Sequence, residues 1–119
     1  MISKKFRLTQ REVKKVLQRG KPFFSYGIVL NYTKNKLSNN RFAIVIWWKS
    51  VITNVQRTSF RRKFYDMMST YINTKHSDSH YDFVFVVKKQ TKLNARDEDS
   101  QKSFQKDINF LIWKIFNKK

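Results

Sequence analysis

The sequence predicts a single α+β domain in which helices pack against a small, mostly antiparallel sheet, in the order αβββαβα. Three observations support this fold class. The 119 residues suffice for one hydrophobic core but not for two ordinary ones. Hydrophobic residues make up 40% and aromatic residues 16%, far more than a disordered basic tail contains. Helix-like and strand-like apolar patterns alternate along the chain, without internal repeats or a linker.

The first predicted element is a helix over residues 9–19. Thr9 and Glu12 have the spacing of a capping box, in which each side chain bonds the backbone of the other residue. Gly20 is expected to end the helix, and Pro22 prevents its continuation. An apolar stripe at one-sided helical spacing consists of Val13, Val16 and Leu17.

Three strand-like runs follow and predict an antiparallel meander. They cover residues 23–24, 28–32 and 42–46, and are joined by short turns. Residues 33–40 are polar and predict a solvent-exposed loop. The run 42–46 is continuously apolar, which predicts a central strand buried on both faces.

The second half of the chain predicts helix, strand and helix. Residues 54–72 form the longest helical pattern, and the polar stretch 73–80 separates it from an apolar strand over 83–87. A closing helix runs from residue 97 or 100 to 116, with acids in its first turn as the helix dipole favours. The expected core positions of the two helices are Phe60, Phe64, Met67, Met68, Tyr71, Phe104, Ile108, Leu111, Ile112 and Ile115.

Charge is the strongest functional signal. The chain has 26 Lys and Arg against 8 Asp and Glu, a formal net charge of +18. No acid occurs between Glu12 and Asp66, although many basic residues do. A merely solvated surface would mix both signs, so a polyanionic partner is expected, and a phosphate backbone is the natural one.

Several classes of function find little support. The absence of cysteine excludes disulfides and thiolate metal sites. No secretory signal and no run of about 18 apolar residues is present, so we expect a cytoplasmic protein that does not span a membrane. His76 and His80 lie in a polar stretch and are expected to be exposed rather than catalytic. The acids 97–99 suit a helix's first turn and need no metal, so we predict neither catalytic nor metal-binding residues.

The segment 49–65 joins a buried strand to a helix that opens with basic and hydroxyl-bearing residues. Helix N-termini bind anions, and arginine adds bidentate contacts to phosphate. The segment resembles the signature of the bacterial ribonuclease P protein family. There, a strand ends in Ser-Lys-Lys, a loop follows, and a helix begins Arg-Asn-Arg-x-x-Arg. Lys49 matches one loop lysine, and Val55 matches the apolar residue before the signature. Arg57 matches the first arginine, and Arg61-Arg62 match the basic pair that follows it. Thr58 and Ser59 stand in place of the Asn and the second Arg.

The resemblance extends over residues 5–116, through Arg7-Leu8, the run from Lys21-Pro22-Phe23 to Tyr32, and Tyr81-Asp82 with the strand that follows. It implies a fold like that of ribosomal protein S5 domain 2. It also implies a protein subunit that binds the catalytic ribonuclease P RNA through the signature helix. The residues expected at that RNA are Lys49, Ser50, Asn54, Arg57, Thr58, Ser59, Arg61, Arg62 and Lys63.

The same resemblance implies a second RNA site, a cleft between the first helix and the sheet for the single-stranded 5′ leader of precursor tRNA. Its expected lining is Val13, Leu17, Phe23, Val29 and Asn31. Ordinary core packing is the alternative for Val13 and Leu17. In this family the RNA and its Mg²⁺ ions carry out the hydrolysis, so no cofactor of the protein itself and no protein partner is implied.

Trp47 and Trp48 stand where relatives carry small residues. One hypothesis is that their side chains stack on RNA bases. The other is that both codons are UGA, which the source organism reads as glycine and which was translated here as Trp. Three other functions remain open. They are a ribosomal-type RNA-binding protein without a nuclease role, a stand-alone nuclease, and a basic protein of the membrane surface. The last is disfavoured because the basic helix is embedded among strands.

Overall fold

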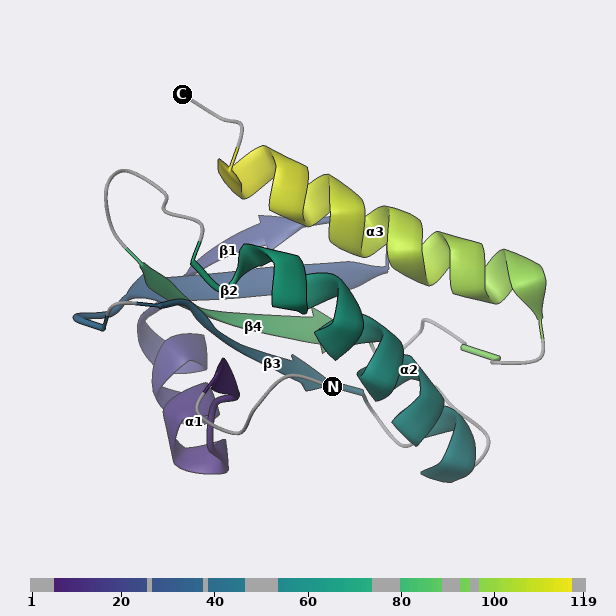
Figure 1. Ribbon diagram of the computed structural model, residues 1–119, viewed down its shortest axis with the longest axis horizontal. Coiled ribbons are helices and arrows are strands. Elements are labelled where there is room, and N and C mark those ends of the chain that lie inside the picture. Colours follow the sequence, from purple (N-terminus) through teal and green to yellow (C-terminus); the bar gives the residue numbers. More distant parts are fainter. Residues whose placement is uncertain are drawn as a thin grey trace.

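The computed structural model confirms the predicted order αβββαβα (Figure 1). It describes residues 6–25, 27–37, 39–46, 54–73, 80–88, 93–94 and 97–116. The elements are α1 (Gln10–Arg19), β1 (Lys21–Phe24), β2 (Ile28–Lys34), β3 (Arg41–Val45), α2 (Asn54–Met68), the 3₁₀ turn η2 (Ser69–Tyr71), β4 (Tyr81–Val87) and α3 (Glu98–Phe116).

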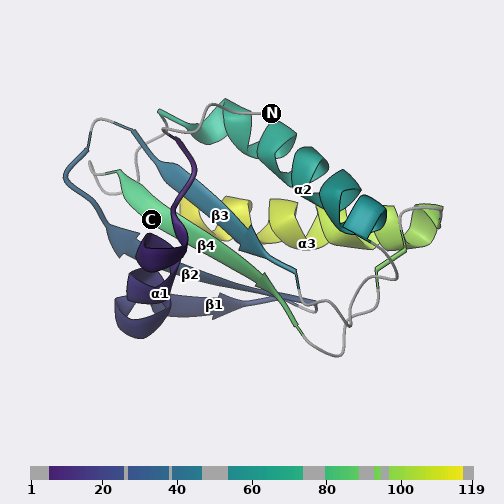
Figure 2. The same cartoon turned by 90° about the horizontal axis from the view of Figure 1, so that it is seen from below.

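The elements form three layers, with the sheet between α1 on one face and α2 and α3 on the other (Figures 1 and 2). The main core lies on the α2–α3 side and contains all the core positions expected for those helices, with Met67 and Tyr71 at its margin. On the other side, Val16 of α1 packs with Ala43 and Val84 in a much smaller cluster. The layer that contains α1 therefore has little apolar contact to hold it in place.

The order of the strands differs from the predicted meander. The sheet runs β1-β2-β4-β3, so β4 inserts between β2 and β3, antiparallel to the first and parallel to the second. A parallel pair needs a long crossover, and α2 supplies it between β3 and β4. The sheet is thus mixed, with two antiparallel pairings out of three.

Strand β3 is buried on both faces, as predicted, but lies at the edge of the sheet rather than at its centre. The N-terminal segment covers part of this edge. Arg7 forms an isolated parallel bridge with Phe42, and the Leu8 backbone N–H donates to the Phe42 carbonyl over 2.9 Å. This cover protects an edge that would otherwise expose backbone hydrogen-bonding groups to other chains.

Helix α1 begins and ends as its sequence predicts. The Thr9 hydroxyl accepts from the Glu12 N–H over 3.3 Å, and the Glu12 carboxylate accepts from the Thr9 N–H over 2.9 Å, so the capping box is complete. At the other end, the Gly20 N–H donates to the Val16 carbonyl over 2.7 Å. Gly20 is needed here because a Cβ would lie 2.6 Å from the Val16 carbonyl oxygen and 2.9 Å from that of Tyr32.

Two polar stretches are more structured than predicted. Thr33 and Lys34 belong to β2, and Asn40 is fully buried rather than in a solvent loop. The Asn40 side chain donates to the Tyr71 carbonyl over 2.7 Å and accepts from the Tyr81 N–H over 2.8 Å, so it joins η2 to the start of β4. Because both the nitrogen and the oxygen of this buried amide have partners, its burial costs less than that of an unbonded amide.

His80 is also buried, at 9% exposure, whereas an exposed position was expected. Its Nε2 atom lies 3.4 Å from the Asn73 carbonyl oxygen, and its own carbonyl accepts from the Asn35 N–H over 3.0 Å. The His80 side chain is therefore buried directly before the start of β4. His76 lies outside the described residues.

Replacing Gly20 with alanine should destabilise the protein by about 1–3 kcal/mol, because the new methyl group meets backbone oxygens that cannot move aside cheaply. Urea denaturation measures this loss. Gln18→Ala, at an exposed position of the same helix, is the control and should change stability by less than about 0.5 kcal/mol. Equal effects of the two substitutions would contradict the close approach at Gly20.

Candidate nucleic-acid interface

The first candidate surface is the solvent side of α2. The helix buries Phe60, Phe64 and Met68 in the core, and the Phe60 ring meets the Phe104 ring edge-on, with centroids 5.0 Å apart. Its remaining sides carry the residues predicted to bind RNA. Thr58, Ser59, Arg61 and Arg62 are exposed, and Arg57 and Lys63 are half-buried. We call the predicted residues Arg57, Thr58, Ser59, Arg61 and Arg62 the α2 surface.

These cations point in more than one direction. Arg57 and Arg61 are four residues apart and share one flank of α2, whereas Arg62 lies about 100° further around the helix. Lys63 turns toward α3 and donates to the Gln101 side chain over 3.0 Å. A hollow of about 590 Å³ runs along the outer side of the helix, lined by Val55, Thr58, Ser59, Arg62, Lys63 and Asp66.

The N-terminal segment adds a cation that the sequence-based site did not include. The Arg7 guanidinium carbon lies 5.8 Å from the centre of the Tyr65 ring. Burial raises the pKa of the Tyr65 hydroxyl, while the nearby charges of Arg7 and Arg61 oppose that rise. Arg7 therefore joins the Arg57–Arg61 flank. Only the pairing of residue 7 with β3 brings it there, so no local pattern signals it.

Part of the predicted RNA site lies outside the described residues. This holds for Lys49 and Ser50, for Trp47 and Trp48, and for the side chain of Asn54, whose backbone begins α2. The predicted contributions of these residues stay predictions.

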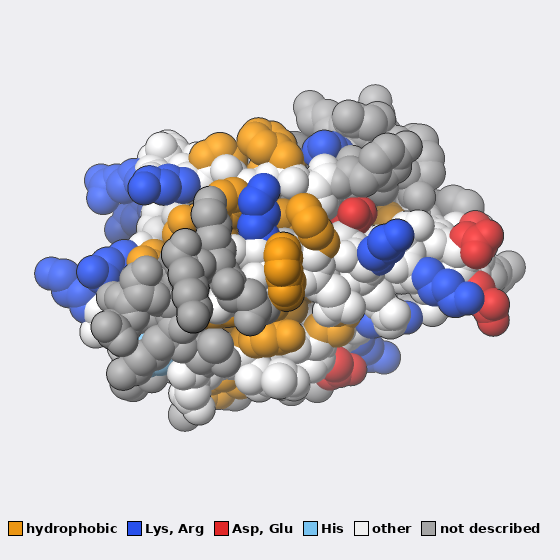
Figure 3. Space-filling view, turned by 90° about the horizontal axis from the view of Figure 1, so that it is seen from above, with side chains coloured by type: hydrophobic (Ala, Val, Ile, Leu, Met, Phe, Trp, Pro, Cys, Tyr) orange, Lys and Arg blue, Asp and Glu red, His pale blue; other side chains and the backbone are white. Residues whose placement is uncertain are grey.

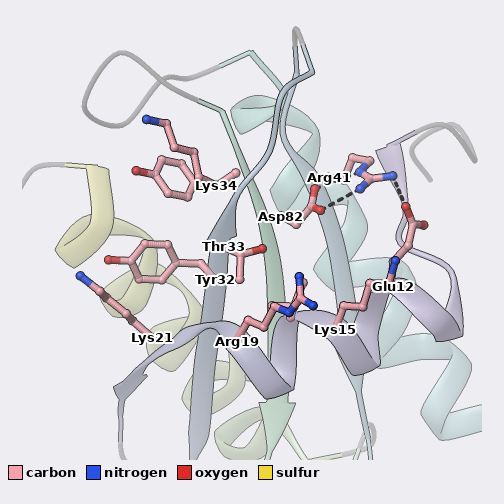
Figure 4. Close-up of a pocket in the computed structure, with 11 residues that line it drawn as sticks. Glu12, Lys15, Arg19, Lys21, Tyr32, Thr33, Lys34, Arg41 and Asp82 are labelled. Atoms are coloured by element: carbon pink, nitrogen blue, oxygen red, sulfur yellow. Dashed lines mark hydrogen bonds and ion pairs between the residues drawn. The ribbon is translucent and has the colours of Figure 1, made fainter.

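The second candidate surface is a cavity of about 590 Å³ beside α1, which we call the α1 pocket (Figure 4). Its lining comes from one side of α1, the start of β1, the end of β2, and the first residues of β3 and β4. The residues are Glu12, Lys15, Val16, Arg19, Lys21, Tyr32, Thr33, Lys34, Arg41, Tyr81 and Asp82. Five of them are basic and two acidic, so the pocket is positively charged overall.

Both acids of the pocket are bound to one arginine. Arg41 donates to the two Asp82 carboxylate oxygens over 2.9 and 2.7 Å and also pairs with the Glu12 carboxylate (Figure 4). The Asn35 side-chain amide donates to Asp82 over 2.8 Å. Burial alone would raise the pKa of Glu12, but hydrogen bonds from Thr9 and the Arg41 charge outweigh it, and that pKa is lowered. The network fastens the cap of α1 to β3 and β4.

The other cations of the pocket have no such partners. Among the residues that the structure describes, Lys15, Arg19, Lys21 and Lys34 form no ion pair or side-chain hydrogen bond. Arg19 rises from α1 toward Thr33, Lys15 lies on the same helix between Arg19 and Glu12, and Lys21 of β1 lies beside Tyr32 (Figure 4). These charges are available to a polyanion.

The residues predicted to line a leader cleft separate into two groups. Val29 and Asn31 are half-buried on the face of the sheet that α1 covers, and Leu17 is 42% exposed. Val13 is half-buried and packs against the small cluster together with Val45 and Val86, as the core alternative anticipated. All four lie outside the lining of the α1 pocket.

Phe23 lies on the opposite face of the sheet, which corrects its predicted place in the same cleft. It pairs with Leu30 and stacks on Tyr32, so it points toward α3. Its neighbour Phe24 pairs with Val29 and is 60% exposed on the α1 side. Because strand side chains alternate, an error of one position exchanges the two faces.

Other chemistry is not evident in the described part of the chain. No group of three or more His, Cys, Asp or Glu side chains comes together there in a way that would hold a metal ion. The Asp97 carboxylate instead accepts from the Asp99 N–H over 3.0 Å at the start of α3. No helix among the described residues is long and apolar enough to cross a membrane.

The fold and these two surfaces define a small cationic α+β protein suited to a phosphate backbone. The chain belongs to the Ribonuclease P family, whose model matches residues 2–112. It therefore functions with ribonuclease P RNA in tRNA processing. No curated protein matches the sequence.

Solved structures of ribonuclease P proteins have the same fold. The chain is similar to a Staphylococcus aureus RNase P protein mutant with defective mRNA degradation activity, at a TM-score of 0.73 and 15% identity, over 95% of this chain and 92% of that one. It is also similar to the Thermotoga maritima RNase P protein, at a TM-score of 0.68 and 21% identity, over 88% of this chain and 94% of that one. At these identities the likeness shows the fold alone.

Replacing Arg41 with methionine should lower the free energy of unfolding by about 3 kcal/mol, because the nearly buried Asp82 carboxylate loses its bidentate partner. Urea denaturation at neutral pH measures the change. Arg62→Met on the α2 surface is the matched control and should cost less than about 0.5 kcal/mol. A loss of similar size in both variants would contradict the structural role of the Arg41 network.

The lowered pKa of Glu12 predicts a pH-dependent contribution to stability. A carboxyl group whose folded-state pKa lies below the ordinary 4.5 stabilises the fold above that value, and the contribution is lost as pH falls through the folded-state pKa. Wild type should therefore exceed Glu12→Gln in unfolding free energy at neutral pH, and the difference should shrink below about pH 4. A difference that stays constant from neutral to acidic pH would contradict this coupling.

Proposed function

We propose that the chain is the protein subunit of ribonuclease P and promotes removal of the 5′ leader from precursor tRNA. In this proposal the α2 surface binds the catalytic RNA, and the α1 side of the sheet binds the single-stranded leader. The observation that carries the proposal is the exposed basic outer side of α2, in a chain of the Ribonuclease P family.

Contact with the catalytic RNA is supported by the geometry of α2. Arg61 and Arg62 are exposed on two sides of a helix whose core face is fixed by Phe60, Phe64 and Met68. Arginines on a rigid helix can make bidentate contacts with phosphates, which adds orientation to the electrostatic attraction. Arg7 widens the same surface toward the edge of β3.

The leader site would use both sides of α1. On one side, Leu17 and Phe24 are exposed and offer apolar contact to unstacked bases, near Val29 and Asn31. On the other side, Lys15, Arg19 and Lys34 of the α1 pocket offer charge to the phosphates. A single strand of RNA presents bases and phosphates together, so it can use the two kinds of contact at once.

The hydrolysis itself is assigned to the RNA partner and its Mg²⁺ ions. The part of the protein is electrostatic: its cations neutralise phosphates and so bring catalytic RNA, leader and metal ions together. We also propose that the protein is located in the cytoplasm.

Reconstitution tests this proposal. The chain should stimulate leader removal from precursor tRNA by ribonuclease P RNA at low Mg²⁺, and should leave precursor tRNA intact when the RNA is omitted. Binding to ribosomal RNA without stimulation would favour a ribosomal role. Cleavage by the protein alone would favour a stand-alone nuclease.

Replacing Arg57, Arg61 and Arg62 with alanine should weaken binding to ribonuclease P RNA at least about tenfold, because charge-assisted contacts are lost. The matched control replaces three exposed cations outside both surfaces, Arg11, Lys14 and Lys36, and so removes the same charge. Filter binding compares the two variants, and circular dichroism checks that both are folded. Equal losses of affinity would mean that only net charge matters.

The salt dependence of binding gives an independent check. If roughly 6–10 phosphates are contacted, affinity for ribonuclease P RNA should fall about 10³–10⁵-fold between about 50 and 200 mM salt. The α2 triple variant should show a shallower slope, since each lost phosphate contact lowers it by about one. A flat response in wild type would refute the electrostatic basis of the interface.

A further inference from the structure

The outer face of α3 carries aromatic side chains that the core does not use. The helix buries one face completely, through Phe104, Ile108, Leu111, Ile112 and Ile115. On the opposite face Phe110 is 44% exposed and Trp113 is 61% exposed, and their spacing of three residues makes them neighbours. Neither of these exposed aromatics belongs to the hydrophobic core.

Lysines lie among these aromatics. The Lys114 ammonium nitrogen is 5.3 Å from the centre of the Phe23 ring and 5.8 Å from that of Phe110. Beside Phe110 lies an open hollow of about 490 Å³, lined by Lys102, Gln105, Lys106, Asn109 and Phe110. In the view of this side, hydrophobic side chains gather over the middle of the surface with Lys or Arg side chains among them (Figure 3).

The acids of α3 lie elsewhere. Glu98 and Asp99 are in its first turn, and Asp107 accepts from the Gly27 N–H over 3.2 Å, which fastens the helix to the turn between β1 and β2. The described positions of the outer face, at 102, 103, 105, 106, 109, 110, 113 and 114, are therefore basic, amide, hydroxyl or aromatic. Their charge is uniformly positive.

The aromatic surface continues onto the sheet. Phe23 of β1 stacks on Tyr32 of β2, with ring centroids 5.5 Å apart and planes 11° from parallel. Lys21 pairs with Tyr32, so its side chain lies on the same face of the sheet as the two rings. We call the combined surface the α3–β1 strip, defined by Phe23, Tyr32, Lys106, Phe110, Trp113 and Lys114.

We propose that the α3–β1 strip is a second binding surface for single-stranded RNA, in which bases stack on Trp113 and Phe110 and phosphates meet Lys106 and Lys114. The proposal rests on the RNA-binding function above and extends it to the face of the sheet opposite α1. Single-strand binding proteins combine aromatic platforms with basic side chains, and such stacking tolerates any base. The strip therefore suits RNA of no particular sequence.

Two other occupants fit less well. A helix that lies on a membrane presents its broad apolar face to the lipid, but α3 uses that face for the core and offers only two aromatics among Lys, Asn and Gln. A second copy of the chain would bring like charges together, since each copy carries a net charge of +18. RNA supplies the opposite charge.

The fluorescence of Trp113 reports directly on RNA bound at the α3–β1 strip. With Trp47 and Trp48 replaced by phenylalanine, Trp113 is the only indole of the chain. A single-stranded oligoribonucleotide of about eight nucleotides should then quench its fluorescence in a saturable manner. Absence of quenching at concentrations that saturate binding would overturn the proposal.

Affinity measurements keep Trp47 and Trp48 in place. In a background that carries Lys15→Ala, Arg19→Ala and Lys34→Ala, which removes the charges of the proposed leader site, the pair Trp113→Ala and Phe110→Ala should weaken binding of the labelled oligoribonucleotide at least about tenfold, by fluorescence anisotropy. Leu37→Ala, which also removes an exposed apolar side chain, should change it less than about twofold. Equal affinities of the aromatic and Leu37 variants would overturn the proposal.

The rival occupants are tested with the same variants. Quenching of Trp113 by vesicles of phosphatidylserine and phosphatidylcholine but not by RNA would replace RNA with a membrane. Loss of self-association in Trp113→Ala, by sedimentation, together with unchanged RNA affinity, would replace it with a second copy. Stimulation of ribonuclease P RNA is assayed separately, so the strip and the proposed function can fail independently.

Discussion

Strand β4 buries Phe83 and Phe85 toward α2 and α3, and Val84 toward α1, so it needs apolar cover on both faces. A strand of this kind needs helices on both faces of its sheet. With β4 between β2 and β3, α1 covers one face of the sheet and α2 and α3 cover the other, which produces the three layers. The two faces of the sheet differ in their apolar contacts, which are extensive under α2 and α3 and few under α1.

Three acids of this very basic chain fasten its elements together. Glu12 and Asp82 hold Arg41, and Asp107 holds the turn at Gly27. Only a small apolar cluster lies beneath α1. The ion pairs of Arg41 with Glu12 and Asp82 therefore help to hold that helix against the sheet. The chain as a whole keeps a net charge of +18, which favours a polyanionic partner.

The cationic surfaces sit on different layers of one scaffold. The α2 surface and the α3–β1 strip lie on elements that pack into the large core. The α1 pocket lies beside a helix that the Arg41 network fastens to β3 and β4. Each is carried by helices or paired strands, so the spacing between cations and aromatics is set by the fold rather than by mobile loops. A scaffold of this kind lets a chain of 119 residues offer RNA several points of contact.

Local patterns in the sequence were enough for the elements themselves. The capping box at Thr9, the stop at Gly20, the core stripes of α2 and α3, and the basic outer side of α2 all follow from residue spacing, because each depends on neighbours within one or two helical turns. The family resemblance also came from the sequence, through the signature in residues 49–65 and the order of the segments around it, and the family model confirms it.

Long-range contacts decided the rest. The position of β4, the burial of Asn40 and His80, and the pairing of Arg41 with Glu12 and Asp82 join residues that are far apart along the chain. The exchange of Phe23 for Phe24 on the α1 side depends on the register between β1 and β2, which apolar residues in succession do not specify. Sequence alone thus determined which segments are helical, extended and basic, whereas the tertiary structure decided which side chains share a surface, because only folding brings distant residues to one face.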